Sequence, residues 1–312
     1  MNSMCHRLSI IVAGVSASFL LLACSAFALA SSDGQQSKVD RRADQAIAVL
    51  VQMTDADSLA AAGLMTVGKN SGQSLAFLAR ATVIDPNRPD LVWLRVARCV
   101  QLPPCDPEPI ERRLRELDPA NSISWWSSLA RAGVAHNSEG LKAALITVGH
   151  SERLDIYWTT LIAHLSRAVT KTKKMSIAES EVAIIGYLAA LLPPYQYVSA
   201  SCKGERLQEP GVTETCRGVA RALQNGDNYL TEMIGVAIAK RVWPEDSPEW
   251  KAAAEERRVY DYRSRLYPKL EQRALTHPGE YLDLCAQNRR EQDVFAAQLT
   301  AAGYDPNPPL QP

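Results

Sequence analysis

The sequence has no net charge, almost no alternating β-branched runs and only one long hydrophobic run. Its 312 residues contain 34 basic and 34 acidic side chains, and there is no arginine-rich tail. This balance argues against a nucleic-acid partner. The scarcity of alternating β-branched residues argues against a β-sheet protein. After residue 30 no apolar run of about 18 residues follows, which argues against an integral membrane protein.

The sequence also lacks the patterns of common catalytic, cofactor and metal sites. It contains no G-x-S-x-G, S-x-x-K or H-E-x-x-H motif. Residues 63–70 (GLMTVGKN) approach a P-loop, but Asn70 replaces the hydroxyl residue that holds magnesium. His136, His150 and His164 fall in different expected helices or turns, unlike zinc ligands. We therefore expect no cofactor and no metal, and we favour a non-enzymatic protein.

The one long hydrophobic run lies at the N-terminus and is typical of an export signal. Residues 1–30 have the order basic, apolar, small-residue, which predicts a signal peptide. Ala28-Leu29-Ala30 predicts cleavage before Ser31 and release into the periplasm. Leu-Leu-Ala-Cys24 offers the alternative of a lipoprotein, in which a lipid on Cys24 is the only membrane contact. We favour release, because Leu22 is large for the second residue of a lipobox.

Cysteine spacing agrees with export. Cys99 and Cys105 flank a Pro-Pro bend, and Cys202 and Cys216 flank a segment with Gly and Pro. In an oxidising compartment we expect each pair to close a small loop by a disulfide, leaving Cys285 as a buried free thiol. The alternative is that all five are ordinary small core residues.

Helical periodicity recurs along the chain, separated by Pro, Gly and Asp. The pattern predicts helices near residues 40–53, 57–67, 73–84, 89–101, 108–117, 122–134, 138–148, 152–170, 176–192, 212–224, 227–243, 248–275 and 279–302. Pro268 should kink or split the helix at 248–275. Residues 31–40 are expected to form a flexible leader, and residues 304–312 a flexible tail.

A repeat with an offset of 33 residues lies in the first half of the chain. DPNRPDLVWLRVAR, from Asp85, aligns with DPANSISWWSSLAR, from Asp118. The Asp-Pro pair should end one helix, and the next carries a Trp and an Ala four residues apart on one face. Such units are helical hairpins that bury their apolar faces by stacking.

These units resemble tetratricopeptide-type helical repeats, which place a small residue four after a Trp and an Ala five before the closing Pro. The matching pairs are Trp93 with Ala97, Trp126 with Ala130, and Ala81 with Pro86. Leu114 departs from the pattern, which has Ala there. The resemblance covers about residues 58–168 and implies a right-handed helical solenoid with a concave partner-binding face.

The organisation expected is therefore all-α. Residues 41–170 form a solenoid-like region of helical-hairpin repeats, and residues 176–303 form a second α-helical region without the repeat register.

Three side chains are candidates for contact with a partner. Trp125 should point about 100° away from Trp126, which faces the stack, and exposed aromatics are favoured at binding surfaces. Arg257 and Arg258 belong to a basic cluster that could hold an acidic partner. The alternatives are that Trp125 is buried and that the arginines pair with neighbouring acidic residues on a solvated face.

Glu179 is the only catalytic candidate. The pair Glu179-Ser180 resembles the Glu-Ser pair of soluble lytic transglycosylases, which implies a general acid acting on peptidoglycan. The Gly-Leu-Met-Gln segment that follows in that family is absent here. The alternative places Glu179 and Glu181 on the solvated side of an amphipathic helix.

Three functions follow in order of preference. The first is an exported, non-enzymatic helical-repeat protein that binds a protein or peptide in the bacterial cell envelope. The second is an envelope immunity or inhibitor protein. The third is a peptidoglycan-active hydrolase or transglycosylase.

Overall fold

The structure is a computed structural model that describes residues 33–66, 70–102, 104–270, 273 and 276–309. Within these ranges the fold is all-α, as predicted, and no strand is formed. The β-type pairing there is an isolated parallel bridge between Asn121 and Arg153. No helix there combines the length and apolarity needed to cross a bilayer. The predicted signal peptide and Cys24 lie outside the described residues.

The α-helices occur close to the predicted ranges. In chain order they are α3 (Asp33–Leu50), α4 (Ala56–Met65), α5 (Ser71–Ile84), α6 (Pro89–Val100), α7 (Glu108–Leu117), α8 (Trp126–Val134), α9 (Ser138–His150), α10 (Trp158–Lys171), α11 (Ile177–Ala189), α12 (Gln196–Ser201), α13 (Val212–Gln224), α14 (Tyr229–Val242), α15 (Pro248–Leu266), α17 (Glu280–Gln287) and α18 (Glu291–Ala301). Short 3₁₀ turns are η1 (Ser122–Trp125), η2 (Gly204–Gln208) and η3 (Tyr267–Leu270).

The repeated Asp-Pro pairs end helices in the same way. Asp85 closes α5 with φ −128° and ψ 84°, and Asp118 closes α7 with φ −143° and ψ 72°. The next element begins four residues later in each case, at Pro89 and Ser122. The 33-residue offset is thus repeated in local structure, because the residue before a proline is driven out of the α region.

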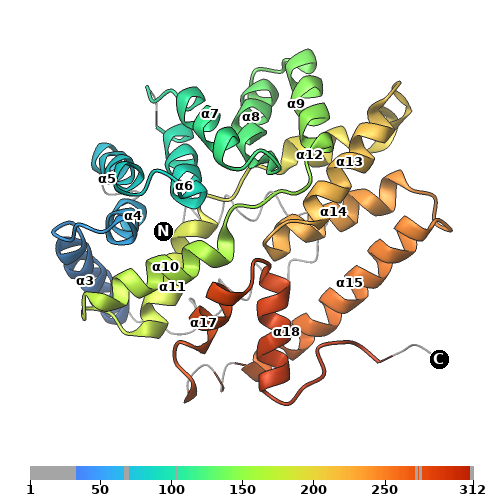
Figure 1. The fold of residues 1–312 in the computed structure, drawn as a ribbon. Helices are drawn as coiled ribbons and strands as arrows, with labels where there is room; N and C mark the ends of the chain where they lie inside the picture. The colour runs from blue at the N-terminus through green and yellow to red at the C-terminus, as the bar shows by residue number, and fades with distance from the viewer. Residues whose placement is uncertain (1–32, 67–69, 103, 271–272, 274–275, 310–312) are drawn as a thin grey trace.

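The hairpins pack in sequence order only as far as α9. Neighbours along this part are α4 with α5, α6 with α7, and α8 with α9, whereas α9 packs next on α13 and α13 on α14. In Figure 1 these helices follow an arc that ends at α15, with α10, α17 and α18 across its open side. α10 and α11 pack on α4, and α10 also packs on α17. Helices of the same chain therefore occupy the inner side of the arc.

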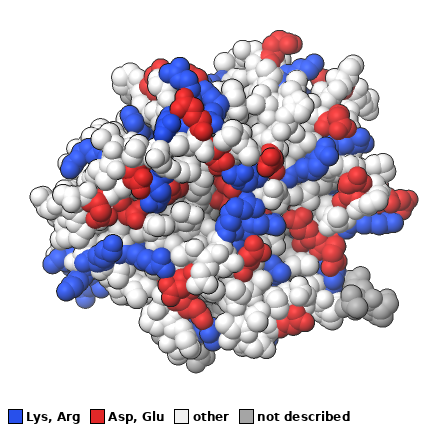
Figure 2. All heavy atoms as spheres, viewed as in Figure 1, with Lys and Arg blue, Asp and Glu red and all other residues white. Residues whose placement is uncertain are grey.

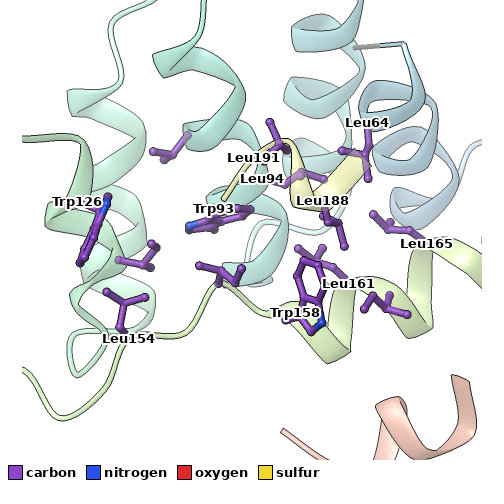
Figure 3. Close-up of a cluster of buried hydrophobic side chains, with 14 of the residues drawn as sticks. Leu64, Trp93, Leu94, Trp126, Leu154, Trp158, Leu161, Leu165, Leu188 and Leu191 are labelled. Carbon is purple, nitrogen blue, oxygen red and sulfur yellow. The ribbon is translucent and has the colours of Figure 1, made fainter. Parts of the chain in front are cut away.

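The tryptophans of the repeat face the helices that cover the inner side of the arc. Trp93 on α6 and Trp126 on α8 are buried in the same apolar cluster as Trp158 on α10 (Figure 3). Leu188 and Leu191, in and just after α11, complete this part of the core. The cluster continues through α13 and α14 to α17, so the two predicted regions share one hydrophobic core.

Two glycines allow α9 and α13 to approach closely. A Cβ on Gly218 would clash with the carbonyl oxygen of Gly149, and one on Gly149 would lie 2.9 Å from the carbonyl oxygen of Thr215. Only hydrogen at these positions permits such close backbone contact. This contact joins the first hairpins to the C-terminal half.

Four predicted helices are shortened or divided, and the one expected at 122–134 is η1 followed by α8. The helix expected at 152–170 begins only at Trp158, because residues 151–157 are held in a non-helical conformation by residues of other turns. The segment 248–275 splits before Pro268, as expected, into α15 and η3. The segment 279–302 divides between Gln287 and Glu291 into α17 and α18.

The ends of the described chain are more ordered than predicted. α3 begins at Asp33, so residues 33–40 are helical rather than a flexible leader. In the predicted tail, Tyr304 packs on a small apolar cluster with Leu270 and Phe295. Arg263 and Arg258 donate to the carbonyl oxygens of residues 306 and 309.

Both expected disulfides are present. Cys99–Cys105 joins the end of α6 to the following loop with a Cα–Cα distance of 5.3 Å, and Cys202–Cys216 joins the end of α12 to α13 with 5.6 Å. Cys285 is a buried free cysteine.

The longer disulfide loop should contribute more stability. Replacing Cys202 and Cys216 together by Ser should lower the free energy of unfolding by about 3 kcal/mol, against about 2 kcal/mol for Cys99 and Cys105, because a longer closed loop restricts the unfolded chain more. Urea unfolding of the oxidised protein measures both. Equal stability of the Cys202/Cys216 variant and the unmutated protein would contradict this expectation.

Candidate functional site

Four interhelical segments meet at a polar centre, which we call the turn junction. They comprise residues 118–122, 151–158, 225–229 and 288–292. Each belongs to a different part of the sequence, and each supplies buried side chains or backbone groups to the others. The junction therefore connects the repeat hairpins, α10, α14 and α18.

Asn121 holds the extended segment before α10. Its Nδ2 donates to the carbonyl oxygen of Asp155 at 2.9 Å, and the Asp155 backbone N donates to its Oδ1 at 3.0 Å. Tyr157 adopts a left-handed conformation with φ 57°, and its hydroxyl donates to Asp118 at 2.8 Å. Backbone groups of this stretch form these hydrogen bonds instead of helical ones, so the helix predicted here does not form.

Asp227 starts α10. Its two carboxylate oxygens accept the backbone N–H groups of Ile156 at 3.1 Å and Trp158 at 2.8 Å. The first N–H groups of a helix have no partner within the helix, so a carboxylate is favourable there. Asp227 is buried, and its burial, together with nearby Asp155, raises the pKa of its carboxyl.

Glu291 makes the matching contact at the start of α14. One oxygen accepts the backbone N–H of Tyr229 at 2.8 Å, and the other accepts Nε1 of Trp158 at 3.0 Å. Its own backbone N–H donates to the carbonyl oxygen of Asp227 at 3.0 Å. Burial raises the pKa of Glu291 to about 7 although it accepts these bonds.

Arginines bind the remaining buried carboxylate of the junction. Arg153 lies 2.7 Å from Asp155 and 2.6 Å from Asp118, and Arg289 lies 2.5 Å from Asp155. Arg289 also donates to the carbonyl oxygen of Asn225. Burial outweighs these cations and raises the pKa of Asp155. A buried carboxylate of this kind is tolerated only because its partners are close.

Beside the junction lies an open hollow of about 460 Å³ on the surface, which we call the polar hollow. Its lining comes from α13, α15 and the start of α18, and comprises Arg221, Gln224, Asn225, Glu256, Val259, Arg290 and Gln292. Behind it, the fully buried Glu232 accepts from Arg290 at 3.1 Å and from Gln292. Burial raises the pKa of Glu232 to about 8.

The lining of the polar hollow is charged and amide-rich. Glu256 accepts from Gln224 at 2.8 Å, and burial raises its pKa. Arg221 is 64% exposed and lies 3.6 Å from Glu214. Small-molecule pockets are mostly apolar and enclosed, whereas this one is open and is lined mainly by charged and amide side chains. Figure 2 shows basic and acidic side chains interspersed over this side, without a broad patch of one sign.

Glu179 has a structural role in the described chain. Its carboxylate accepts the backbone N–H of Ser176 at 2.9 Å in a capping box at the start of α11. It also pairs with Arg42 at 2.7 Å. The first contact stabilises the start of α11, and the second joins α11 to α3. Glu181, expected on the solvated side, is half-buried instead, and its Oε1 lies among the described residues without a hydrogen-bond partner.

The candidate partner-binding residues have partners within the chain. Trp125 is half-buried beneath the guanidinium of Arg115, 4.3 Å from its ring centre. Arg257 pairs with Asp261 at 2.9 Å, and Arg258 pairs with Glu255 at 2.7 Å. This agrees with the alternative of paired arginines on a solvated face. The residues that line the polar hollow lie elsewhere on α13, α15 and α18.

Sequence reasoning missed the turn junction and the polar hollow. Asp227 and Glu291 belong to no motif, and their bonds to Ile156 and Trp158 span 71 and 133 residues. The one local signal was the Asp227-Asn228 pair before a helix, where Asn228 caps α14 by accepting from Thr231.

Comparisons with family models, curated proteins and solved structures gave no match. Within the described ranges no group of three or more His, Cys, Asp or Glu side chains is placed to hold a metal ion.

Loss of the Asp227 carboxylate should destabilise the whole fold. Asp227→Ala leaves two buried N–H groups without partners, which should cost on the order of 3 kcal/mol, and Asp227→Asn should cost less because one acceptor remains. Urea unfolding measures the effect, with the exposed Asp246→Ala as control. A loss no larger than that of the control would contradict the role given to Asp227.

Glu181 should make stability depend on pH. Burial raises its pKa to about 7, so the folded chain keeps a proton that the unfolded chain releases near pH 4.5. The free energy of unfolding should therefore fall as pH rises from about 4.5 to about 7. Glu181→Gln should remove this part of the slope and add about 1 kcal/mol at pH 8, after allowance for partial exposure.

Urea unfolding at pH 5, 6.5 and 8 tests this, with the exposed Glu139→Gln on α9 as the matched control. Parallel pH profiles for Glu181→Gln and the unmutated protein would refute it.

Proposed function

We propose that the chain is an exported, non-enzymatic helical protein of the bacterial cell envelope that binds a protein or peptide segment at the polar hollow. The observation that carries the proposal is an open, charged hollow on a rigid base. Arg290 and Gln292 line it and are fixed from behind by Glu232, so the lining is ordered before any partner arrives.

Export is supported by two features. The signal-like segment 1–30 is the first, and the second is the pair of disulfides, which form and persist in oxidising compartments. Release before Ser31 remains our preference over a lipid on Cys24. Intact-mass measurement of the mature protein would distinguish the two cut sites.

The place of binding differs from the one that the tetratricopeptide resemblance implies. In such repeats the inner face of the arc receives the partner, but here α10 and α11 pack on α4 and cover part of that face. The polar hollow lies at the other end, between α13, α15 and the start of α18. Its mixture of arginine, amide and carboxylate suits a polar segment with hydrogen-bonding groups.

Site-specific photo-crosslinking in the native host would test this function. A photoreactive residue at Val259, in the polar hollow, should yield a defined adduct, and one at Val83, which is 78% exposed at the end of α5, should not. Arg221→Glu should reduce the Val259 adduct at least fivefold by reversing a charge in the lining. Arg112→Glu makes the same change on exposed α7 and should leave it unaltered.

No adduct at Val259, or one that is insensitive to Arg221→Glu, would count against the polar hollow as the binding surface. If the adduct contains a toxin that acts on the envelope, the inhibitor alternative is the correct form of the function.

A further inference from the structure

The C-terminal segment, Tyr304–Pro309, lies along α15. Gly303, with φ 81°, ends α18 in a left-handed turn, and the backbone N–H of Tyr304 donates to the carbonyl oxygen of Leu299 at 2.9 Å. This is the pattern of a glycine-terminated helix that turns the chain back on itself. In Figure 1 the chain after α18 then runs beside α15 toward the start of that helix.

The segment is anchored at its first residue. The Tyr304 ring packs against the cluster that contains Leu270, Phe295 and Leu299, and Nζ of Lys269 lies 4.9 Å from its centre. Beyond Tyr304 the residues alternate: Pro306 and Pro308 are half-buried, and Asp305, Asn307 and Pro309 are exposed. The backbone bends at residues 306 and 307, where the Asn307 backbone N–H donates to Oδ1 of Asp305 at 2.9 Å.

Two arginines of α15 hold the segment by its backbone. Arg263 Nε donates to the carbonyl oxygen of Pro306 at 3.0 Å, and Arg258 donates to that of Pro309 at 2.9 Å. The five helical residues between the two arginines span about 7.5 Å, less than the roughly 10 Å that three residues can span at most. The segment therefore runs antiparallel to α15.

These contacts are made to backbone carbonyl oxygens rather than to particular side chains. Proline lacks a backbone donor, so the carbonyl oxygens of a proline-rich segment meet few competing backbone N–H groups. Both arginine bonds in the described residues go to proline carbonyl oxygens. Any segment with prolines at a similar spacing presents the same two acceptors.

α15 is suited to exchange its occupant. Of its 19 residues Ala253 is the buried one, and the others are half-buried or exposed. Arg258 is 26% exposed. Arg263 also donates to the carbonyl oxygen of Gln292 at 3.2 Å, a residue that lines the polar hollow. The segment thus lies next to the binding surface already described.

We propose that the face of α15 with Arg258 and Arg263 is a docking site for a proline-rich segment of a partner protein. The C-terminal segment occupies this site in the free protein and competes with that partner. The inference rests on the proposed function, because it names the class of ligand. A tethered competitor acts at millimolar effective concentration and so weakens the apparent affinity of a free peptide.

Peptide binding to two forms of the protein tests the proposal. The probe is a fluorescent peptide with the sequence of residues 305–312, DPNPPLQP, measured by fluorescence anisotropy. One form is the mature chain, and the other ends at Asp305 and so keeps the Tyr304 anchor. We expect at least tenfold tighter binding to the shortened form, and no binding when the prolines of the peptide are replaced by alanine.

Variants of the shortened form locate the site. Arg258→Ala should weaken binding at least fivefold, and the exposed Arg265→Ala on the same helix is the matched control that should not. Circular dichroism confirms that each variant is folded. Equal affinity of both forms, no affinity of the folded shortened form, or equal effects of the two variants would each overturn the proposal.

A second copy is the competing occupant. If the mature chain forms a dimer that dissociates on shortening, the C-terminal segment docks between copies and the proposal is wrong. Photo-crosslinking at Val259 reports on the polar hollow alone, so failure of the peptide experiment leaves the proposed function standing. If crosslinking fails and the peptide binds, the polar hollow is ruled out as the binding surface and the α15 docking site is retained.

Discussion

Hydrogen bonds from buried N–H groups to the carboxylates of Asp227 and Glu291 connect parts of the chain that are far apart in sequence. Asp227 begins α10, and Glu291 begins α14 and fixes the Trp158 ring. In a site with little water each bond is strong, and each missing partner is costly. The hairpins, the inner helices and the C-terminal helices depend on these few groups, which hold four turns from distant parts of the sequence close together.

This constraint separates the fold from a simple repeat array. In an array each hairpin contacts only its neighbours, and the inner face stays open. Here the row continues from α9 to α13, and the intervening α10 and α11 pack on α4. The Trp and Ala spacing that resembles a tetratricopeptide repeat remains in place, but it packs against helices of the same chain. The binding surfaces that we propose accordingly lie on the outside of α15 and at the polar hollow.

Local chemistry could be predicted from sequence, and distant pairing could not. Helix ends at Asp85 and Asp118 and the cap at Ser247 depend on adjacent residues, as do the two short-range cysteine pairs. The extended segment at 151–157 was read as helix because its partners, Asn121 and Asp227, lie 34 and 71 residues away. The polar hollow joins three helices in the same non-local manner, so no motif marks it.

The placement of α10 has a consequence for how the chain reaches its native state. α10 contacts α4, about 100 residues earlier, and α17, more than 100 residues later. Contacts between residues far apart in sequence slow folding, because long loops must close before apolar surface is buried. A chain that emerges N-terminus first cannot complete its core until α17 has appeared. Nascent chains should thus leave part of the apolar surface of α10 exposed until synthesis is nearly finished, and need protection from aggregation in that interval.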